Sequence, residues 1–344
     1  MGLGSQSRIA VAGAGSIGCY VGGCLALGGR GVSLLLRTAL AETIGRSGVR
    51  ISDLDGADRS LAPAALALTT DPAQAFAQAD AILVTVKSGA TEEMARLVAQ
   101  HARPGTVVVS LQNGVGNVDR LKVHLGDKHT IVAGMVPFNV VQTREQLGRP
   151  RFHRTTSGTL LIAEGVPGLK ALLDVPGSAV AEHADMGAVQ WGKLLLNLNN
   201  ALNALSGLPL ATQLADRRWR VLLAAQIEEA LAVVRASGIR PARIESVPPR
   251  MIPFILRLPD ALFRVAARRM LAIDPQARSS MWEDLERRRP TEIEYLQGAI
   301  VALASMASLP SPTSARIARL VRQAENAGAG SPRLLPEQIA GQIA

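Results

Sequence analysis

The chain of 344 residues is poor in aromatic side chains, cysteine and histidine. Aromatic residues make up 3% of the sequence, so we expect a core of small aliphatic side chains and no ring platforms for stacking nucleic-acid bases. The only cysteines, Cys19 and Cys24, form neither a disulfide framework nor a zinc motif, which is typical of the reducing cytoplasm. The five histidines are scattered, and their spacing predicts no metal site.

The charge balance is basic, with 37 Lys and Arg against 28 Asp and Glu and a formal net charge of +9. This excess favours anionic small molecules, such as a phosphorylated cofactor or a carboxylate substrate, although a solvated arginine-rich surface is the alternative. Basic and acidic residues alternate, as in 283–289, which argues against a nucleic-acid partner. The uncharged stretches 9–29 and 194–215 contain several glycines or asparagines, so we predict no membrane span.

The pattern of apolar residues divides the chain into two parts. Before residue 187, short apolar strands alternate with helices, which predicts a mainly parallel sheet of the α/β Rossmann type with helices on both faces. After it, helical periodicity prevails. The predicted strands cover 9–12, 32–36, 81–86, 106–111, 131–136 and 160–163, and the later helices 191–206, 219–237, 259–271, 280–287, 291–308 and 314–326. We therefore predict an NADP-binding domain over 1–186 and an all-α substrate domain over 187–344, with a frayed tail from about residue 328.

A glycine-rich turn follows the first predicted strand and opens a predicted helix. Its residues, Gly13, Ala14, Gly15, Ser16, Ile17 and Gly18, match the pattern G-x-G-x-x-G. In this context the first glycine permits a tight turn, the second lets the backbone approach a pyrophosphate, and the third allows the helix to pack on the strand. The helix N-terminus then faces the anion. We predict that the turn binds a dinucleotide; a purely structural turn is the alternative.

Three further residues follow predicted strands, at the sheet edge where cofactors bind. Arg37 stands where an NAD enzyme usually carries an acidic residue, and an arginine suits the 2′-phosphate of NADPH. Lys87 is equally compatible with a phosphate contact and with a surface position. Asn113 lies in the glycine-containing segment 112–116, where its amide can donate and accept hydrogen bonds, although a common Asn-Gly turn is the alternative.

The predicted helix 191–206 carries one lysine and four asparagines among apolar residues. At ~100° per residue, Lys193, Asn197 and Asn200 share one face. Buried amides need partners, which a polar ligand would supply; a structural network between the domains is the alternative. Reduction of a ketone by hydride leaves an alkoxide, and a lysine whose pKa is lowered by burial is suited to protonate it.

Ser280 and Glu292 lie at the beginnings of two predicted helices. Ser280 and Glu283 fit a capping box, and Pro290 lies near the beginning of the helix that contains Glu292. From spacing alone, these structural roles account for both residues.

Taken together, the motifs resemble the ketopantoate reductase (2-dehydropantoate 2-reductase) family. The matching pieces span nearly the whole chain in the family's order: 13–18, Arg37, Lys87, 112–116, 191–200, 280–281 and 290–294. The K-x-x-x-N helix combined with the later S-M and T-E-I-E segments is specific, whereas the glycine turn alone is not.

The resemblance implies a Rossmann domain joined to a helical domain of the 6-phosphogluconate-dehydrogenase type, with the active site between them. It implies NADPH-dependent reduction of 2-dehydropantoate to (R)-pantoate, a step toward pantothenate and coenzyme A. Lys193 would protonate the carbonyl oxygen, and Glu292 would hold the substrate hydroxyl and tune Lys193. Ser280 would bind the substrate carboxylate and Asn197 the substrate. Asn113 would contact cofactor or substrate near the nicotinamide.

Three positions depart from the family pattern. Ala201 replaces an asparagine eight residues after the lysine, and Asn200, one residue earlier, is a candidate substitute. Ala277 replaces an asparagine three residues before the serine, and Gln297 the asparagine of an Asn-Gly pair. We expect these positions to line or adjoin the substrate pocket, so they bear on the choice of substrate more than on the chemistry.

Two alternatives to this activity stay open. A paralogous NADP-dependent reductase would act on another small keto acid, and a panel of keto acids separates the two. A non-catalytic NADP(H)-binding sensor would bind the cofactor without turnover, although the presence of both Lys193 and Glu292 argues against it. The sequence does not determine the oligomeric state and leaves a homodimer open.

Overall fold

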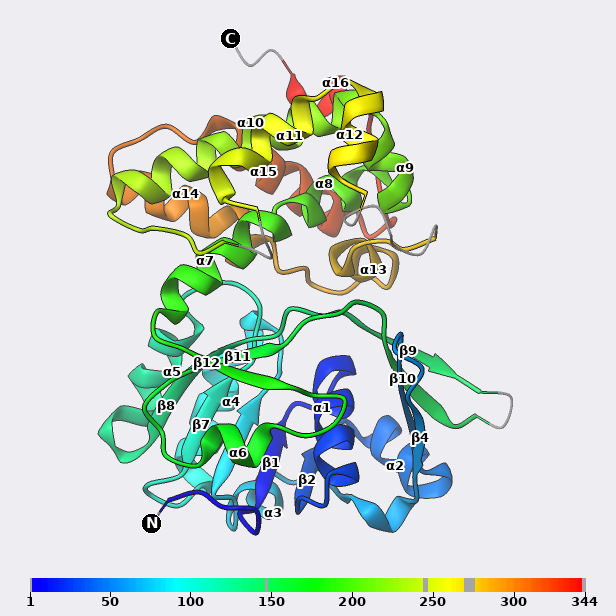
Figure 1. Cartoon of the computed structure of the whole chain (residues 1–344), viewed down its shortest axis with the longest axis vertical. Helices are drawn as coiled ribbons and strands as arrows, with labels where there is room; N and C mark the ends of the chain where they lie inside the picture. The colour runs from blue at the N-terminus through cyan, green and yellow to red at the C-terminus, as the bar shows by residue number, and fades with distance from the viewer. Residues whose placement is uncertain (1, 146–147, 244–246, 269–275, 342–344) are drawn as a thin grey trace. The chain divides into compact units, whose positions relative to one another are not determined.

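The computed structural model describes residues 2–145, 148–243, 247–268 and 276–341. The chain divides into two compact units, Met1–Met186 and Gly187–Ala344 (Figure 1). No helix in the described ranges is long and apolar enough to span a membrane.

The first unit is built on an eight-stranded sheet with the order β12-β11-β8-β7-β6-β1-β2-β5. All neighbouring strands pair in parallel except β8 and β11, which are antiparallel. The strands are β1 (Ile9–Ala12), β2 (Val32–Leu35), β5 (Ala67–Thr69), β6 (Ala81–Val84), β7 (Val107–Ser110), β8 (Thr130–Met135), β11 (Leu160–Ala163) and β12 (Val180–His183). The predicted mainly parallel α/β sheet is confirmed.

The central strands β1, β6 and β7 are buried on both faces, and their alternate residues point to opposite sides of the sheet. Ile9 and Val11 of β1 belong to one apolar cluster, which includes residues of the first helix, whereas Ala10 and Ala12 belong to another, which includes Phe76. The helices of this unit are α1 (Ser16–Leu27), α2 (Thr38–Ser47), α3 (Pro72–Phe76), α4 (Thr91–His101), α5 (Asn117–Leu125) and α6 (Leu169–Leu173). Asp71 caps α3 as its residue type predicts, by accepting a hydrogen bond from the amide of Ala73.

A second sheet of four strands lies in the first unit, with the order β4-β3-β10-β9. Its strands are β3 (Val49–Asp53), β4 (Asp58–Leu61), β9 (Val140–Arg144) and β10 (Pro150–Arg154). None of the predicted strands covers 49–61 or 140–154, so the sequence pattern missed this sheet. Its strands carry many charged residues and hold together partly through ion pairs, such as that between Arg154 and Asp53, so they lack the apolar runs that mark buried strands.

The second unit is helical, as predicted. Its helices are α7 (Met186–Asn197), α8 (Asn199–Ser206), α9 (Leu210–Ala215), α10 (Arg217–Ala236), α11 (Ile252–Arg257), α12 (Asp260–Ala266), α13 (Ser280–Glu286), α14 (Gln297–Met306), α15 (Pro312–Ala327) and α16 (Pro336–Ala340). The long helix α10 packs against α11, α14 and α15 (Figure 1). The predicted helix 259–271 forms as α12 in its first part, whereas 269–271 lie outside the described residues.

Three features of this unit differ from the sequence-based expectation. The helix predicted over 191–206 is interrupted at Leu198, whose backbone stays in the right-handed helical region. The helix predicted from Thr291 begins later, with a short 3₁₀ turn η5 (Ile293–Tyr295) before α14. The tail that we expected to fray forms α16, in which Ile339 is buried. A frayed tail is therefore wrong for the described residues 328–341.

Candidate active site

In the first unit, the predicted cofactor residues follow the carboxyl ends of neighbouring parallel strands. The glycine turn follows β1, Arg37 follows β2, Lys87 follows β6 and Asn113 follows β7. Because these strands are adjacent in the order β7-β6-β1-β2, the four segments lie along one edge of the sheet. This is the edge at which open α/β sheets bind their ligands.

Two glycines of the turn differ in what an added Cβ would meet. Gly13 adopts a left-handed φ of +78°, and a Cβ there would lie 2.0 Å from Cγ1 of Val86. Gly15 precedes the first residue of α1 and is exposed, and a Cβ added to it would meet no atom within 4 Å. Gly13 is thus required by the fold, whereas Gly15 leaves open space beside the N-terminus of α1, where a pyrophosphate fits.

Arg37 lies two residues beyond the end of β2 and is exposed. The same end of β2 is tied to the glycine turn, because the amide of Ala14 donates a hydrogen bond of 2.9 Å to the carbonyl of Leu35. The Arg37 guanidinium makes no hydrogen bond or ion pair within the described ranges. It therefore stands near the turn with its donors available to an anion.

A buried polar network holds the loops after β6 and β7 together. Ser88, which follows Lys87, donates to the carbonyl of Asn113 at 2.9 Å, and the Asn117 amide donates to the same carbonyl at 2.8 Å. Gln112 is buried and donates to the carbonyl of Val86 at 3.1 Å. The Asn113 backbone is therefore fixed while its side chain is exposed. The sequence reasoning missed Ser88 and Asn117 as supports, because their role depends on two loops meeting.

In the second unit, Lys193 lies in the last two turns of α7, an amphipathic stretch with buried neighbours on both sides. Leu194 and Leu195 are fully buried. Burial of the ammonium group lowers the pKa of Lys193 to about 8. The lysine is therefore able to exchange a proton near neutral pH.

The four asparagines of α7 and α8 fall into two groups. Asn199 and Asn203 bond to Gln213 of α9, so this pair belongs to a structural network within the second unit. The side-chain amides of Asn197 and Asn200 make no hydrogen bond to any residue that the structure describes, and both are half-buried. These are the two that share the Lys193 face in the helical projection, which leaves their amides available to a ligand.

The capping interaction at the beginning of α13 differs from the one that the spacing predicted. Ser279, and not Ser280, caps the helix: its hydroxyl accepts a hydrogen bond of 3.2 Å from the amide of Trp282. Ser280 is exposed, and its hydroxyl has no hydrogen-bond partner among residues 2–145, 148–243, 247–268 and 276–341. The capping role that the spacing predicted for Ser280 therefore belongs to Ser279.

Glu292 lies immediately before η5 and is half-buried. Glu294, two residues later, is instead paired with Arg322 of α15 at the surface. Gln297 at the beginning of α14 is fully buried and donates 2.9 Å to the carbonyl of Leu198, at the interruption between α7 and α8. This bond ties the segment that carries Glu292 to the helix that carries Lys193.

The three departures from the family pattern differ in burial. The side chains of Ala201 and Gln297 are fully buried, and Gln297 donates to the Leu198 carbonyl, so neither side chain is exposed in this structure. Ala277 is half-buried, and its carbonyl accepts a hydrogen bond from the amide of Leu210. Of the three, only Ala277 has an accessible side chain.

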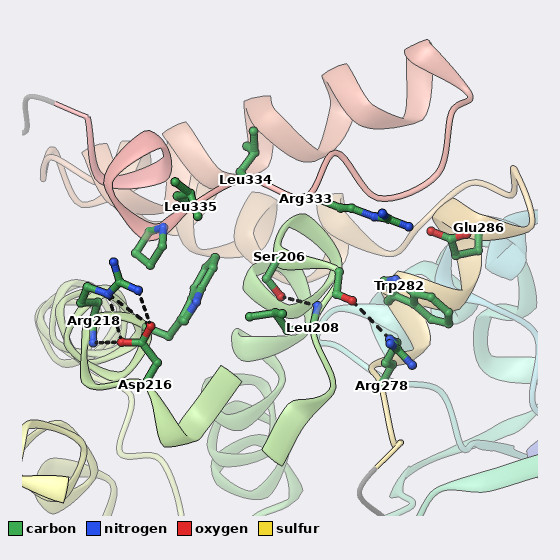
Figure 2. A pocket seen from close by; sticks show the side chains of 13 residues that line it. Ser206, Leu208, Asp216, Arg218, Arg278, Trp282, Glu286, Arg333, Leu334 and Leu335 are labelled. Carbon is green, nitrogen blue, oxygen red and sulfur yellow. Dashed lines mark hydrogen bonds and ion pairs between the residues drawn. The ribbon is translucent and has the colours of Figure 1, made fainter. Parts of the chain in front are cut away.

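A hollow of about 470 Å³ in the second unit lies apart from these residues (Figure 2). It is lined at one end by Arg278, Trp282, Glu286 and Arg333, and at the other by Asp216 and Arg218. Its lining does not include Lys193, Asn197, Asn200, Ser280 or Glu292. The charges at this hollow are of both signs.

Comparison with known proteins decides the family. The family model described as ketopantoate reductase PanE/ApbA matches residues 9–166, and the model of its C-terminal part matches residues 185–325. The chain belongs to the ketopantoate reductase family. It is accordingly an oxidoreductase with a Rossmann-like domain for a nicotinamide cofactor, which the open space at Gly15 accommodates.

Similar proteins cover almost the whole chain. The 2-dehydropantoate 2-reductase of Halobacterium salinarum is 30% identical over 326 residues, 93% of this chain and 100% of that protein. The crystal structure of a PanE/ApbA family ketopantoate reductase from Ralstonia eutropha JMP134 is 27% identical, with a TM-score of 0.77 and coverage of 93% and 99%. A D-mandelate dehydrogenase solved with NADH and anilino(oxo)acetate shares the fold, with a TM-score of 0.73, 20% identity and coverage of 93% and 99%.

Proposed function

We propose that this ketopantoate reductase family member reduces 2-dehydropantoate to (R)-pantoate with NADPH. The observation that carries the proposal is Lys193 of α7, with a pKa of about 8, together with the amides of Asn197 at the end of α7 and Asn200 in α8, which are available to a ligand. The similarity to curated 2-dehydropantoate 2-reductases over nine-tenths of the chain supports the choice of substrate.

The first unit would hold the cofactor. Residues 13–18 would receive the pyrophosphate at the N-terminus of α1, and Arg37 would pair with the 2′-phosphate. Lys87 would add a second cation, and Asn113 would contact the nicotinamide end or the substrate. When bound, the reduced nicotinamide supplies the hydride.

The second unit would hold and protonate the keto acid. Ser280 would donate a hydrogen bond to the carboxylate, Asn197 and Asn200 would bind polar groups of the substrate, and Glu292 would hold its hydroxyl. As negative charge develops on the carbonyl oxygen, the Lys193 ammonium would stabilise it and transfer a proton from Nζ to that oxygen. The carbonyl group is then a neutral hydroxyl group, the carboxylate is unchanged, and the lysine regains its proton from solvent.

The test is NADPH oxidation with 2-dehydropantoate, run beside pyruvate, 2-ketoisovalerate and benzoylformate. We expect the highest kcat/KM with 2-dehydropantoate. A higher kcat/KM with another keto acid would overturn the choice of substrate and leave the chemistry standing.

The cofactor is tested with NADH and with the variant Arg37→Ala. Removal of a charge-assisted hydrogen bond to the 2′-phosphate should raise the KM for NADPH by about 10- to 100-fold and leave that for NADH unchanged. Arg46→Ala, which removes an arginine from the last turn of α2, is the matched control. Equal use of NADPH and NADH by the unmodified protein would contradict the role of Arg37.

A second candidate is a reductase of a different small 2-keto acid. The observation that favours it is Ala277, which is half-buried and lies three residues before Ser280, where the family usually has an asparagine. A smaller side chain there leaves room for a bulkier substrate. The variant Ala277→Asn should then shift kcat/KM from the preferred substrate toward 2-dehydropantoate.

A further inference from the structure

The short segment that leads into α13 is fastened to the turn between α8 and α9 (Figure 2). The amide of Leu210 donates 2.9 Å to the carbonyl of Ala277, and Nε of Arg278 donates 3.3 Å to the carbonyl of Gly207. Arg278 also stacks on Trp282 of α13, with its guanidinium carbon 4.6 Å from the ring centre. The segment is therefore held by several contacts and not by one.

Asn203 of α8 makes the central contact of this fastening. Its Oδ1 accepts a hydrogen bond of 2.8 Å from the amide of Ser279. Its Nδ2 donates 2.9 Å to the carbonyl of Leu208 and 3.0 Å to Oε1 of Gln213. The Asn203 side chain is fully buried. Its oxygen accepts one hydrogen bond and its amide nitrogen donates two, so the orientation of the side chain is fixed.

Ser279 completes the connection between α13 and α8. Its hydroxyl donates 3.0 Å to the carbonyl of Asn200 while it accepts from the amide of Trp282. One buried serine thus joins the beginning of α13 to the backbone of Asn200. Ser280 follows directly in sequence, with its hydroxyl left for another partner.

We propose that Asn203 is a positioning residue for keto acid binding, which holds Ser280 at a defined place relative to Asn200. The inference rests on the proposed function, in which Ser280 and Asn200 contact the substrate. Asn203 itself is buried in the network and acts through Ser279. Loss of its contact should let the beginning of α13 move and should weaken substrate binding, with little effect on proton transfer by Lys193.

The variant Asn203→Leu tests this, because it keeps the branching at Cγ and removes all three hydrogen bonds. We expect the KM for the keto acid to rise by about tenfold, the effect of about one lost hydrogen bond, and kcat to stay within about threefold. Backbone amide exchange over 276–286 should accelerate. Ser206→Ala is the matched control, since the Ser206 hydroxyl bonds to the backbone of Asn203 and Leu208 in the same turn and makes no hydrogen bond to the described segment 277–280.

Two variants of Ser279 test the same inference if Asn203→Leu does not fold. Ser279→Ala removes the cap and the bond to Asn200, and should reproduce the rise in KM. Ser279→Thr retains a hydroxyl that can make both bonds and should restore the original KM.

A double-mutant cycle with Ser280→Ala separates positioning from general destabilisation. If Asn203 acts through Ser280, the double variant should have nearly the KM of Ser280→Ala alone. Multiplicative effects on KM would overturn the inference. If Ser280→Ala raises KM and Asn203→Leu does not, the positioning role fails while the proposed function stands. If Ser280→Ala leaves KM unchanged, the proposed role of Ser280 fails, and this inference fails with it.

Discussion

At the scale of single residues, neighbouring side chains of the same type do different work. Asn199 and Asn203 satisfy a buried network, whereas the amides of Asn197 and Asn200 are left for a ligand. Ser279 caps α13, and Ser280 does not. Chemical type and helical spacing reduce the number of candidate site residues, but the hydrogen-bond partner of each side chain decides its role.

The pKa of Lys193 gives a prediction about pH. With a pKa of about 8, the lysine is protonated below that pH and neutral above it. Keto acid reduction requires the protonated form, so kcat/KM, which reports the free enzyme, should be constant at lower pH and fall with rising pH above about 8. Oxidation of the hydroxy acid requires the neutral form and should show the opposite dependence. Steady-state kinetics in both directions from acidic to alkaline pH, across the pKa of Lys193, measure this.

Lys193→Ala supplies the complementary test. General acid catalysis contributes about 10²- to 10⁴-fold, so kcat should fall by that amount, and kcat/KM should lose its dependence on pH near the pKa of the lysine. The affinity for NADPH should change little, because the cofactor residues lie in the first unit. A variant that keeps the original kcat or the original pH profile would rule out Lys193 as the proton donor.

At the scale of elements, two glycines of the turn at the beginning of α1 should have different effects when replaced: Gly13 on stability and Gly15 on cofactor binding. Gly13→Ala introduces a Cβ 2.0 Å from Val86 at a left-handed φ, so it should lower the free energy of unfolding by at least about 1–2 kcal/mol. Gly15→Ala meets no atom within 4 Å and should leave that free energy nearly unchanged, yet weaken NADPH binding by about tenfold or more. Denaturant unfolding and cofactor titration measure the two quantities. Equal NADPH affinity in Gly15→Ala and the unmodified protein would contradict the pyrophosphate site.

The elements also show where sequence patterns mislead. Strands β1, β6 and β7 are buried on both faces, and their apolar runs predict them well. Strands β3, β4, β9 and β10 were missed, because charged side chains interrupt their pattern and partners far apart in sequence stabilise them, as Arg154 pairs with Asp53. The predicted capping box at Ser280 is wrong by one residue. Ser279 caps the helix instead, and its hydrogen bonds to Asn203 and Asn200 hold it at that position.

At the scale of the whole molecule, the cofactor should stabilise one of the two units. NADPH at about 100 times its dissociation constant should add about 2.7 kcal/mol to the stability of the state that binds it. The thermal unfolding transition that includes the first unit should therefore move to higher temperature with NADPH. Calorimetry of the full chain measures this, with Gly15→Ala as the control that should show a smaller shift. An unchanged transition would argue against cofactor binding by the first unit.

The sequence by itself determined the elements whose signals are local. The strand, glycine turn and helix at 9–27, the parallel α/β sheet and the later helical region follow from apolar periodicity and turn residues, and the separated motifs were enough to indicate the family. The second sheet, the burial of Ala201 and Gln297, and the fastening of Ser279 by Asn203 were decided only by the tertiary structure. Each depends on which groups distant in sequence meet, and hydrogen bonds between such groups leave no periodic trace along the chain.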